Sequence, residues 1–208
     1  MANLISERGF SICRACDGND LVSILDLGEQ PLPAEYGENA TDVLDRFPLH
    51  LKICRECGLG QLGEYVLPDR IFHNTYPYLS SASEYWVNHA KQFASEMVKK
   101  LFLDKDSLVI ELGSNDGYLL SQFQKLGVSV LGVEPPENTA EIARQAGVPT
   151  ISKFFGEELA NNILSEYGHP KLIVVNNVYA HIPDQQDFTI GMSILADDST
   201  TITIENPS

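Results

Sequence analysis

Apolar and amphipathic segments alternate regularly along the second half of the chain. Short runs rich in valine, isoleucine and leucine are separated by segments in which apolar residues recur every three or four positions. The pattern predicts strands at residues 107–112, 128–134, 149–152, 171–177 and 199–205. It predicts helices at residues 117–127, 137–147, 156–168 and 184–195. This order indicates a parallel sheet covered on both faces, hence a doubly wound, Rossmann-like α/β fold.

The first half of the chain has a different texture. Its apolar pieces are short and interrupted by prolines, which is typical of a small, loop-rich module. One amphipathic helix follows, begun by a capping box of Ser81 and Glu84. Its apolar positions are Trp86, Ala90, Phe93, Met97 and Leu101. We therefore expect a module at residues 1–80, a connecting helix at 81–105 and an α/β domain at 106–208.

Composition and charge narrow the classes of partner. Hydrophobic residues make up 43% of the 208 residues, which suffices for a core. Lys and Arg number 14 against 29 Asp and Glu, a net charge of −15 that repels nucleic acids and anionic membranes. No apolar run approaches the roughly 20 residues of a membrane span, and the amino-terminal segment lacks the order of a secretory signal. We expect a cytoplasmic protein with a small-molecule partner, and the oligomeric state stays open.

All four cysteines lie in two short pairs, Cys13 with Cys16 and Cys54 with Cys57. Two residues between thiols let both sulfurs of a pair bind one ion, which suits a tetrahedral zinc site. Disulfides would need an oxidising compartment, and a redox pair normally follows a strand of a βαβ unit. With no histidine beside the pairs, we expect a structural zinc ion. The segment "LDLGEQPLPAEYGENATD" between them is interpreted as an inserted loop.

The stretch "ELGSNDG" joins the first predicted strand of the α/β domain to its first helix. Glu111 ends the strand, and Gly113 and Gly117 permit tight bends and a close approach of the backbone to a ligand. Asn115 tolerates a left-handed conformation. The carboxylate of Asp116 can accept a hydrogen bond from a ligand ammonium group. Because ligands of doubly wound sheets bind beyond the carboxyl ends of the strands, this turn is a candidate binding loop.

Glu134 ends the second strand about 20 residues further on, where an acidic residue binds the hydroxyls of a ribose. The loop lacks the third glycine of a dinucleotide fingerprint and places carboxylates where a pyrophosphate needs N–H donors. The site therefore favours a phosphate-free adenosine ligand with a cationic tail, and S-adenosylmethionine fits that description. The alternative is a structural glycine turn with Glu134 on the surface.

Several motifs resemble a known family. "ELGSNDGYLL", "VLGVEPPENTAEIARQAGVPTISKFF" and "NNVYAHIPD" resemble the class I S-adenosylmethionine-dependent methyltransferases, and more narrowly the sugar C-methyltransferases that act on deoxysugar nucleotides. "LDLGEQPLP", "FPLHLKICRECGLGQL" and "FHNTYPYLSSASEYW" resemble the zinc-binding module of the same family. The likeness covers nearly the whole chain in order.

The resemblance implies a role for each matching residue. The cofactor loop would consist of Gly113, Asn115, Asp116 and Gly117, and the ribose would be bound by Glu134. The adenine would contact Phe154, and the residues facing the methyl-transfer site would be Asn176 and Asn177. Three residues would reach over the cofactor, namely Tyr76, Tyr78 and Ser81. Phe154 could equally belong to the core, and the tyrosines to amphipathic packing.

The chemistry of such an enzyme requires a base and an enolate donor. Methyl transfer to carbon needs a carbanion-like nucleophile, formed by removing a proton beside a ketone while the enolate oxygen is stabilised. His181, just beyond the fourth strand, is the candidate base or polarising donor, and Tyr76 is a candidate donor. The alternative for His181 is an incidental loop position.

The sequence stops directly after the fifth predicted strand, whereas the related enzymes continue with further strands and a carboxyl-terminal domain. We expect either a fragment or a shortened relative. One alternative function is therefore a catalytically idle cofactor-binding or assembly module. Another is a zinc module that recruits nucleic acid or protein, and the net charge of −15 opposes nucleic acid.

Overall fold

The computed structural model describes residues 12–33, 35–37, 39, 41–63 and 66–206. The ends of the predicted first and last domains, and three residues of the predicted inserted loop, lie outside the described residues. Contacts divide the chain into two compact units. One holds the described residues up to Phe72 together with Pro183–Gln186, and the other holds His73–Ile182 and the described residues from Asp187 on.

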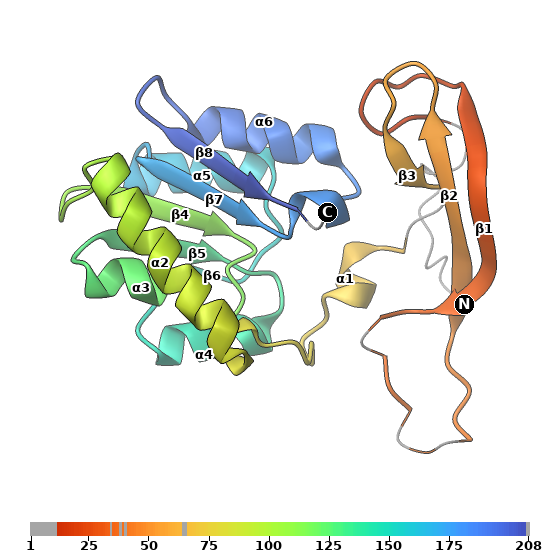
Figure 1. Ribbon diagram of the computed structural model, residues 1–208, viewed down its shortest axis with the longest axis horizontal. Coiled ribbons are helices and arrows are strands. Elements are labelled where there is room, and N and C mark those ends of the chain that lie inside the picture. The colour runs from red at the N-terminus through yellow and green to blue at the C-terminus, as the bar shows by residue number, and fades with distance from the viewer. Residues whose placement is uncertain (1–11, 34, 38, 40, 64–65, 207–208) are drawn as a thin grey trace. The chain divides into compact units, whose positions relative to one another are not determined.

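The first unit is built on a three-stranded antiparallel sheet of β1 (Leu21–Pro31), β2 (Arg46–Cys54) and β3 (Gly60–Leu62), in that order (Figure 1). The prediction of a loop is wrong for "LDLGEQP", which belongs to β1 and pairs with β2. The pairing is irregular at two places along β1, and Gly28 lies at one of them with φ +64°. Such bulges disrupt the alternation of apolar and polar residues by which a strand is recognised.

The apolar core of this unit is small. Among the described residues it consists of Leu32, Phe47 and Val66, with Ile71 of helix α1 (Pro68–Ile71) packed against them. A cluster of this size cannot offset the conformational entropy of ordering some 60 residues. An additional constraint is therefore needed, and Cys13 and Cys54 are both fully buried.

The second unit begins with helix α2 (Glu84–Lys100), which follows a single 3-10 turn, η1 (Ser80–Ala82). The predicted capping box is wrong, because the N-cap is Ser83, whose hydroxyl accepts a hydrogen bond from the backbone N–H of Trp86 at 3.3 Å. The backbone N–H of Ser81 instead donates to Asp116, so this serine serves the loop after β4.

The sheet of the second unit has five parallel strands in the order β6-β5-β4-β7-β8 (Figure 1). The strands are β4 (Leu108–Leu112), β5 (Ser129–Val133), β6 (Thr150–Ile151), β7 (Leu172–Asn176) and β8 (Thr201–Glu205). The connecting helices are α3 (Leu120–Lys125), α4 (Glu137–Gln145), α5 (Glu157–Tyr167) and α6 (Gln185–Leu195), with a 3-10 turn η2 (Tyr179–His181) after β7. The predicted doubly wound α/β fold is confirmed. The chain turns from one half of the sheet to the other beside β4, which is where ligands bind in such folds.

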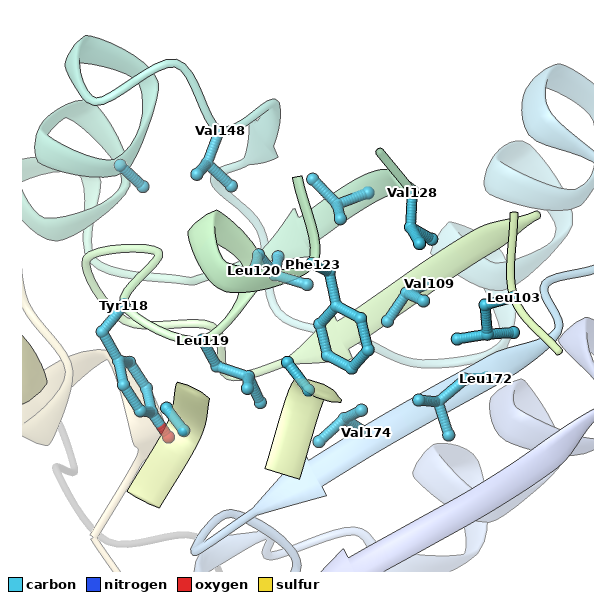
Figure 2. Close-up of a cluster of buried hydrophobic side chains, with 14 residues drawn as sticks. Leu103, Val109, Tyr118, Leu119, Leu120, Phe123, Val128, Val148, Leu172 and Val174 are labelled. Carbon is cyan, nitrogen blue, oxygen red and sulfur yellow. The ribbon is translucent and has the colours of Figure 1, made fainter. Parts of the chain in front are cut away.

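Two apolar clusters hold this sheet. One contains Val109 and Val174 of the sheet and side chains of α2, α3 and α4, and Figure 2 shows Tyr118 at one end of it and Leu172 at the other. The second cluster lies on the opposite face, under α5 and α6. Within the described residues β8 is an edge strand, and its isoleucines are partly exposed, Ile202 by 39% and Ile204 by 49%. No helix of the described chain has the length and apolarity of a membrane span.

Candidate functional site

The four cysteines of the first unit converge as the spacing predicts. Their Sγ atoms all lie within 4.8 Å of one another, with Cys13 and Cys57 3.5 Å apart and Cys16 and Cys54 3.7 Å apart. All four are free thiols. A tetrahedral zinc ion with Zn–S bonds of about 2.3 Å requires sulfurs about 3.8 Å apart, so the donor set fits zinc.

The local backbone and the charges support a metal at this place. Gly58 has φ +81° and lies in the turn after Cys54, as expected for a turn that wraps around a metal-bound thiolate. Burial opposes ionisation of Cys13, but the N–H groups of Ala15 and Cys16 outweigh it and lower its pKa to about 7. At Cys16 the N–H of Gly18 favours the thiolate, yet the neighbouring sulfurs, Cys57 first, raise the pKa to about 12. Four thiols so close together cannot all ionise unless a cation compensates their charge.

In the second unit, the loop after β4 has the backbone that its glycines predict. Gly113 has φ +75°, Asn115 φ +50° and Gly117 φ +77°. A Cβ atom at Gly113 would collide with Val178, and one at Gly117 would lie 3.0 Å from a methyl carbon of Val148. These positions therefore need glycine both for conformation and for space.

Three carboxyl groups gather at this loop with almost no exposure. Glu111 is 0% exposed and neither of its oxygens has a hydrogen-bond partner in the described chain, while Asp116 and Glu134 are each 5% exposed. Burial first, and then the charges of Glu134 and Asp116, raise the pKa of Glu111 well above its ordinary value. Burial also raises the pKa of Glu134 to about 7, although the N–H of Asn115, 2.9 Å from its Oε2, lowers it. The cluster is an electrostatically negative site that favours a cationic ligand.

The segment before α2 crosses this loop and is fixed to it by hydrogen bonds. Asn115 accepts from the N–H of Ser80 at 2.8 Å and donates from its side-chain amide to the carbonyl of Tyr78 at 3.2 Å. Asp116 Oδ2 accepts from the N–H of Ser81 at 3.0 Å, while Oδ1 has no partner among the described residues. The structure thus brings the backbone of Tyr78 and Ser81 to the loop. It also shows that Ser81 meets the loop through its backbone.

Tyr76 and Asn138 form a second connection at this edge of the sheet. The carbonyl of Tyr76 accepts a hydrogen bond from the side-chain amide of Asn138 at 2.8 Å. Burial, followed by the negative charge of Glu134, raises the pKa of the Tyr76 phenol. The sequence reasoning missed Asn138, because an asparagine in the first turn of a helix is common and carries no motif of its own.

The remaining candidates lie around the carboxyl ends of the strands, with different exposure. Phe154 is 47% exposed and belongs to neither buried cluster, so the interpretation as a core residue is wrong. Asn176 ends β7, and Asn177 follows it with φ +55°. His181 ends η2 and is exposed.

Asn177 also belongs to a group of interacting side chains that the sequence reasoning missed. Its side-chain amide donates to Glu205 Oε1 at 3.0 Å, and Glu205 Oε2 lies 3.4 Å from Nε2 of His89 on α2. His89 stacks on Trp86 with 5.0 Å between ring centroids. No sequence signal joins these residues, because they come from α2, from the residue after β7 and from β8, which are far apart along the chain.

Comparisons with known proteins agree with this architecture. Residues 13–72 match the family described as "Putative zinc binding domain", and residues 86–199 match the family described as "Methyltransferase domain". The C-methyltransferase NovU of Streptomyces niveus is 32% identical over 185 residues, which cover 88% of this chain and 44% of that protein. The chain thus spans less than half the length of this curated relative.

Solved structures with a similar fold show low identity. A methyltransferase from Anabaena variabilis is 18% identical with a TM-score of 0.48, over 65% of this chain and 57% of its own. A methyltransferase from Archaeoglobus fulgidus is 13% identical with a TM-score of 0.44, over 60% of this chain and 59% of its own. The plantazolicin methyltransferase BpumL, solved with SAH, is 12% identical with a TM-score of 0.40, over 57% of this chain and 51% of its own.

Proposed function

This chain belongs to the class I S-adenosylmethionine-dependent methyltransferases, and we propose that it binds S-adenosylmethionine for methyl transfer to carbon. The acceptor that we propose is a keto-deoxysugar nucleotide. A C-methyltransferase among the relatives supports the proposed reaction, and the likeness of the sequence motifs to sugar C-methyltransferases supports the proposed acceptor.

The observation that carries the proposal is the buried carboxyl cluster beside a glycine-bearing loop. Its acidic side chains would repel the pyrophosphate of a dinucleotide, whereas an adenosyl compound with ammonium and sulfonium groups would neutralise them. Orphaned oxygens on Glu111 and Asp116 fit a cationic ligand that satisfies them when it binds.

In the proposed complex, Gly113 and Gly117 keep the loop open for the methionine part of the cofactor. Glu134 accepts hydrogen bonds from the ribose hydroxyls through the oxygen that does not bind Asn115. The Asp116 carboxylate accepts from the ammonium group through its unpartnered oxygen. Hydrogen bonds from Ser80 and Ser81 hold the loop in this conformation before the ligand arrives, so less entropy is lost on binding.

The other predicted cofactor contacts surround these. We propose that Phe154, about half exposed in the segment that follows β6, stacks on the adenine. Tyr78, also about half exposed, covers the cofactor from the segment before α2. Asn176, at the end of β7, and Asn177, which follows it, contact the cofactor on the side that faces the methyl-transfer site.

The reaction itself needs a proton removed from the carbon next to the acceptor's ketone. Bound S-adenosylmethionine supplies an electrophilic methyl group to the resulting carbanion. We propose that the imidazole of His181 takes that proton, and that the hydroxyl of Tyr76 donates a hydrogen bond to the developing enolate oxygen. The Cys₄ group (Cys13, Cys16, Cys54 and Cys57) would hold a zinc ion that stabilises the first unit and takes no part in the chemistry.

The experiment that tests the function has a binding step and a turnover step. Calorimetric titration should show S-adenosylmethionine binding and no binding of NAD, because only the former lacks phosphates. Methyl transfer is then measured with a series of keto-deoxysugar nucleotides, on the natural protein from which the chain comes, carrying any segments that flank it. In that protein His181→Asn should lower turnover and leave cofactor affinity unchanged.

Three outcomes would count against the proposal or a part of it. NAD binding in place of S-adenosylmethionine would overturn the cofactor. Cofactor binding without any methylated product would favour the idle binding or assembly module. Unchanged turnover in His181→Asn would remove that residue from the mechanism, and His169→Asn, at a histidine that bonds the carbonyl of Leu195, is a suitable control.

A further inference from the structure

Glu111 is the only carboxyl group of the described chain whose two oxygens are both buried and without a hydrogen-bond partner. It stands near the end of the central strand β4, beside Gly132 of β5 and Val174 of β7. Neither neighbour has a polar side chain that could bind the carboxyl group. Alternation along the strand puts Glu111 on the same face as Val109, which packs in the apolar cluster of Figure 2.

The ionisable groups that act on Glu111 are acidic. They are the carboxyl groups of Asp116, in the loop after β4, and Glu134, after β5. The charge of Glu111 acts in turn on the phenol of Tyr118, before α3. Burial and then the charge of Glu111 raise the pKa of Tyr118, so this phenol stays neutral.

Basic groups on the helices packed over this face are either exposed or engaged elsewhere, and the three lysines of α2, Lys91, Lys99 and Lys100, are exposed. His89 of α2 lies 3.4 Å from Glu205, and Lys125 of α3 donates to Gln122 at 3.2 Å. Arg144 of α4 pairs with Glu137 and Glu141 of the same helix. The structure therefore provides no cation of its own for Glu111 within the described residues.

A fully buried carboxylate without a hydrogen bond or a counter-charge is strongly unfavourable, so the group must bind either a proton or a cation. Both states are available here if the proposed function holds. An empty site can neutralise Glu111 with a proton, and an occupied one with the positive charge of the ligand. The two must compete, because binding of the cation favours the ionised carboxylate and binding of the proton opposes it.

We propose that Glu111 holds a proton while the site is empty and releases it to solvent when a sulfonium ligand binds. Glu111 is then the residue that selects the charged cofactor over its uncharged thioether product. This inference rests on the proposed function. S-adenosylmethionine and S-adenosylhomocysteine share the ammonium group and differ by the sulfonium charge and its methyl group. Loss of that charge after transfer lets Glu111 take a proton back from solvent, and this exchange weakens the hold on the product.

The test is calorimetric titration of both ligands in pairs of buffers with different ionisation enthalpies, between about pH 5.5 and about pH 8.5. The apparent enthalpy difference between buffers gives the number of protons released. Glu134, whose pKa is raised to about 7, can lose a proton with either ligand. For S-adenosylmethionine we therefore expect the release of up to one proton more than for S-adenosylhomocysteine, and this extra proton makes its affinity rise more steeply with pH, by up to about tenfold per pH unit. For S-adenosylhomocysteine we expect less release and a flatter profile.

Glu111→Gln keeps the shape of the side chain and cannot ionise. We expect it to abolish most of the difference in proton release between the two ligands, to bring the pH profile of S-adenosylmethionine close to that of S-adenosylhomocysteine, and to reduce the preference for S-adenosylmethionine. Glu158→Gln, at an exposed position of α5, is the matched control and should behave as the unaltered chain does.

The outcomes separate this inference from the function on which it rests. Binding of neither ligand at any pH overturns both. Binding of S-adenosylmethionine with no proton release, with the same release for both ligands, or with release unchanged in Glu111→Gln overturns the inference alone. The comparison of proton release between the two ligands needs only the unaltered chain, so it tests the inference even if Glu111→Gln does not fold.

Discussion

The two units of this chain offset the conformational entropy that the backbone loses on folding in opposite ways. The first has an apolar core of three buried hydrophobic residues in its described part and draws its fixed geometry from four converging sulfurs. The second has two large apolar clusters and keeps ionisable groups buried at the end of its central strand. A large core tolerates unfavourable polar groups at a functional site, whereas a small one needs a metal to fold at all.

Removing the metal should have the largest effect and should be confined to the first unit. Chelation of zinc, or Cys54→Ser, should unfold this unit, because structural zinc supplies on the order of 10 kcal/mol or more of folding free energy. Loss of the cobalt–thiolate absorption of cobalt-substituted protein reports the first unit. Fluorescence of Trp86, the single tryptophan, reports the second. A native melting curve of Trp86 after chelation is expected, and its loss would show that the units depend on each other.

A cavity in the apolar core of the second unit should destabilise that unit and leave the zinc site of the first unit intact. Phe123 is fully buried and packs edge-on against Phe93, so Phe123→Ala should destabilise this unit by about 3–5 kcal/mol. Denaturant unfolding followed at Trp86 measures the loss, while metal content should remain one zinc per chain. Loss of the zinc together with the core would contradict the contrast drawn between the units.

Replacing the predicted ribose ligand should affect binding more than folding. Glu134→Ala removes charge-assisted hydrogen bonds of about 1.5–3 kcal/mol each, so affinity for S-adenosylmethionine should fall by roughly one to two orders of magnitude. Glu134→Gln retains an acceptor for the N–H of Asn115 and separates loop structure from ribose binding. Titration calorimetry that finds wild-type affinity in Glu134→Ala would remove the ribose assignment.

The smallest expected effect is on the pH dependence of stability without ligand. The pKa of Glu111 is raised in the folded state, so between its unfolded and folded pKa the folded chain binds more protons than the unfolded chain does. Stability contributed by this group is therefore present below the unfolded pKa and is lost as pH rises through the folded pKa. The pKa of Glu134 is raised to about 7, so the stability that this group contributes is likewise lost as pH rises.

Glu111→Gln should consequently flatten this decline and raise the melting temperature at pH 8 by a few degrees. Trp86 fluorescence during thermal unfolding at pH 5.5 and pH 8 measures it, with Glu158→Gln as control. A variant that is less stable than the unaltered chain at pH 8 would show that Glu111 contributes a favourable interaction in the empty protein.

Local patterns were sufficient for much of the second unit. Strands of β-branched residues, helices ended by Gly127 and Gly147, and the glycines of the β4 loop all predicted what the structure contains, since each depends on neighbours in sequence. Sequence patterns failed where contacts between residues far apart in the chain decide the local structure. The irregular pairing of β1 disrupts its sequence pattern, and α2 begins at Glu84 with Ser83 as its N-cap, while the N–H of Ser81 bonds Asp116, 35 residues away.

The sequence by itself determined the chemical types at both sites, four thiols in two pairs and carboxylates at the ends of two strands, because residue identity and spacing along the chain express them directly. Only the tertiary structure decided that Glu111 is fully enclosed without a partner and that Asn177, Glu205 and His89 meet. Burial and partner choice depend on segments distant in sequence that pack together. The protonation of a buried carboxyl group follows from that packing, since desolvation and neighbouring charges set its pKa.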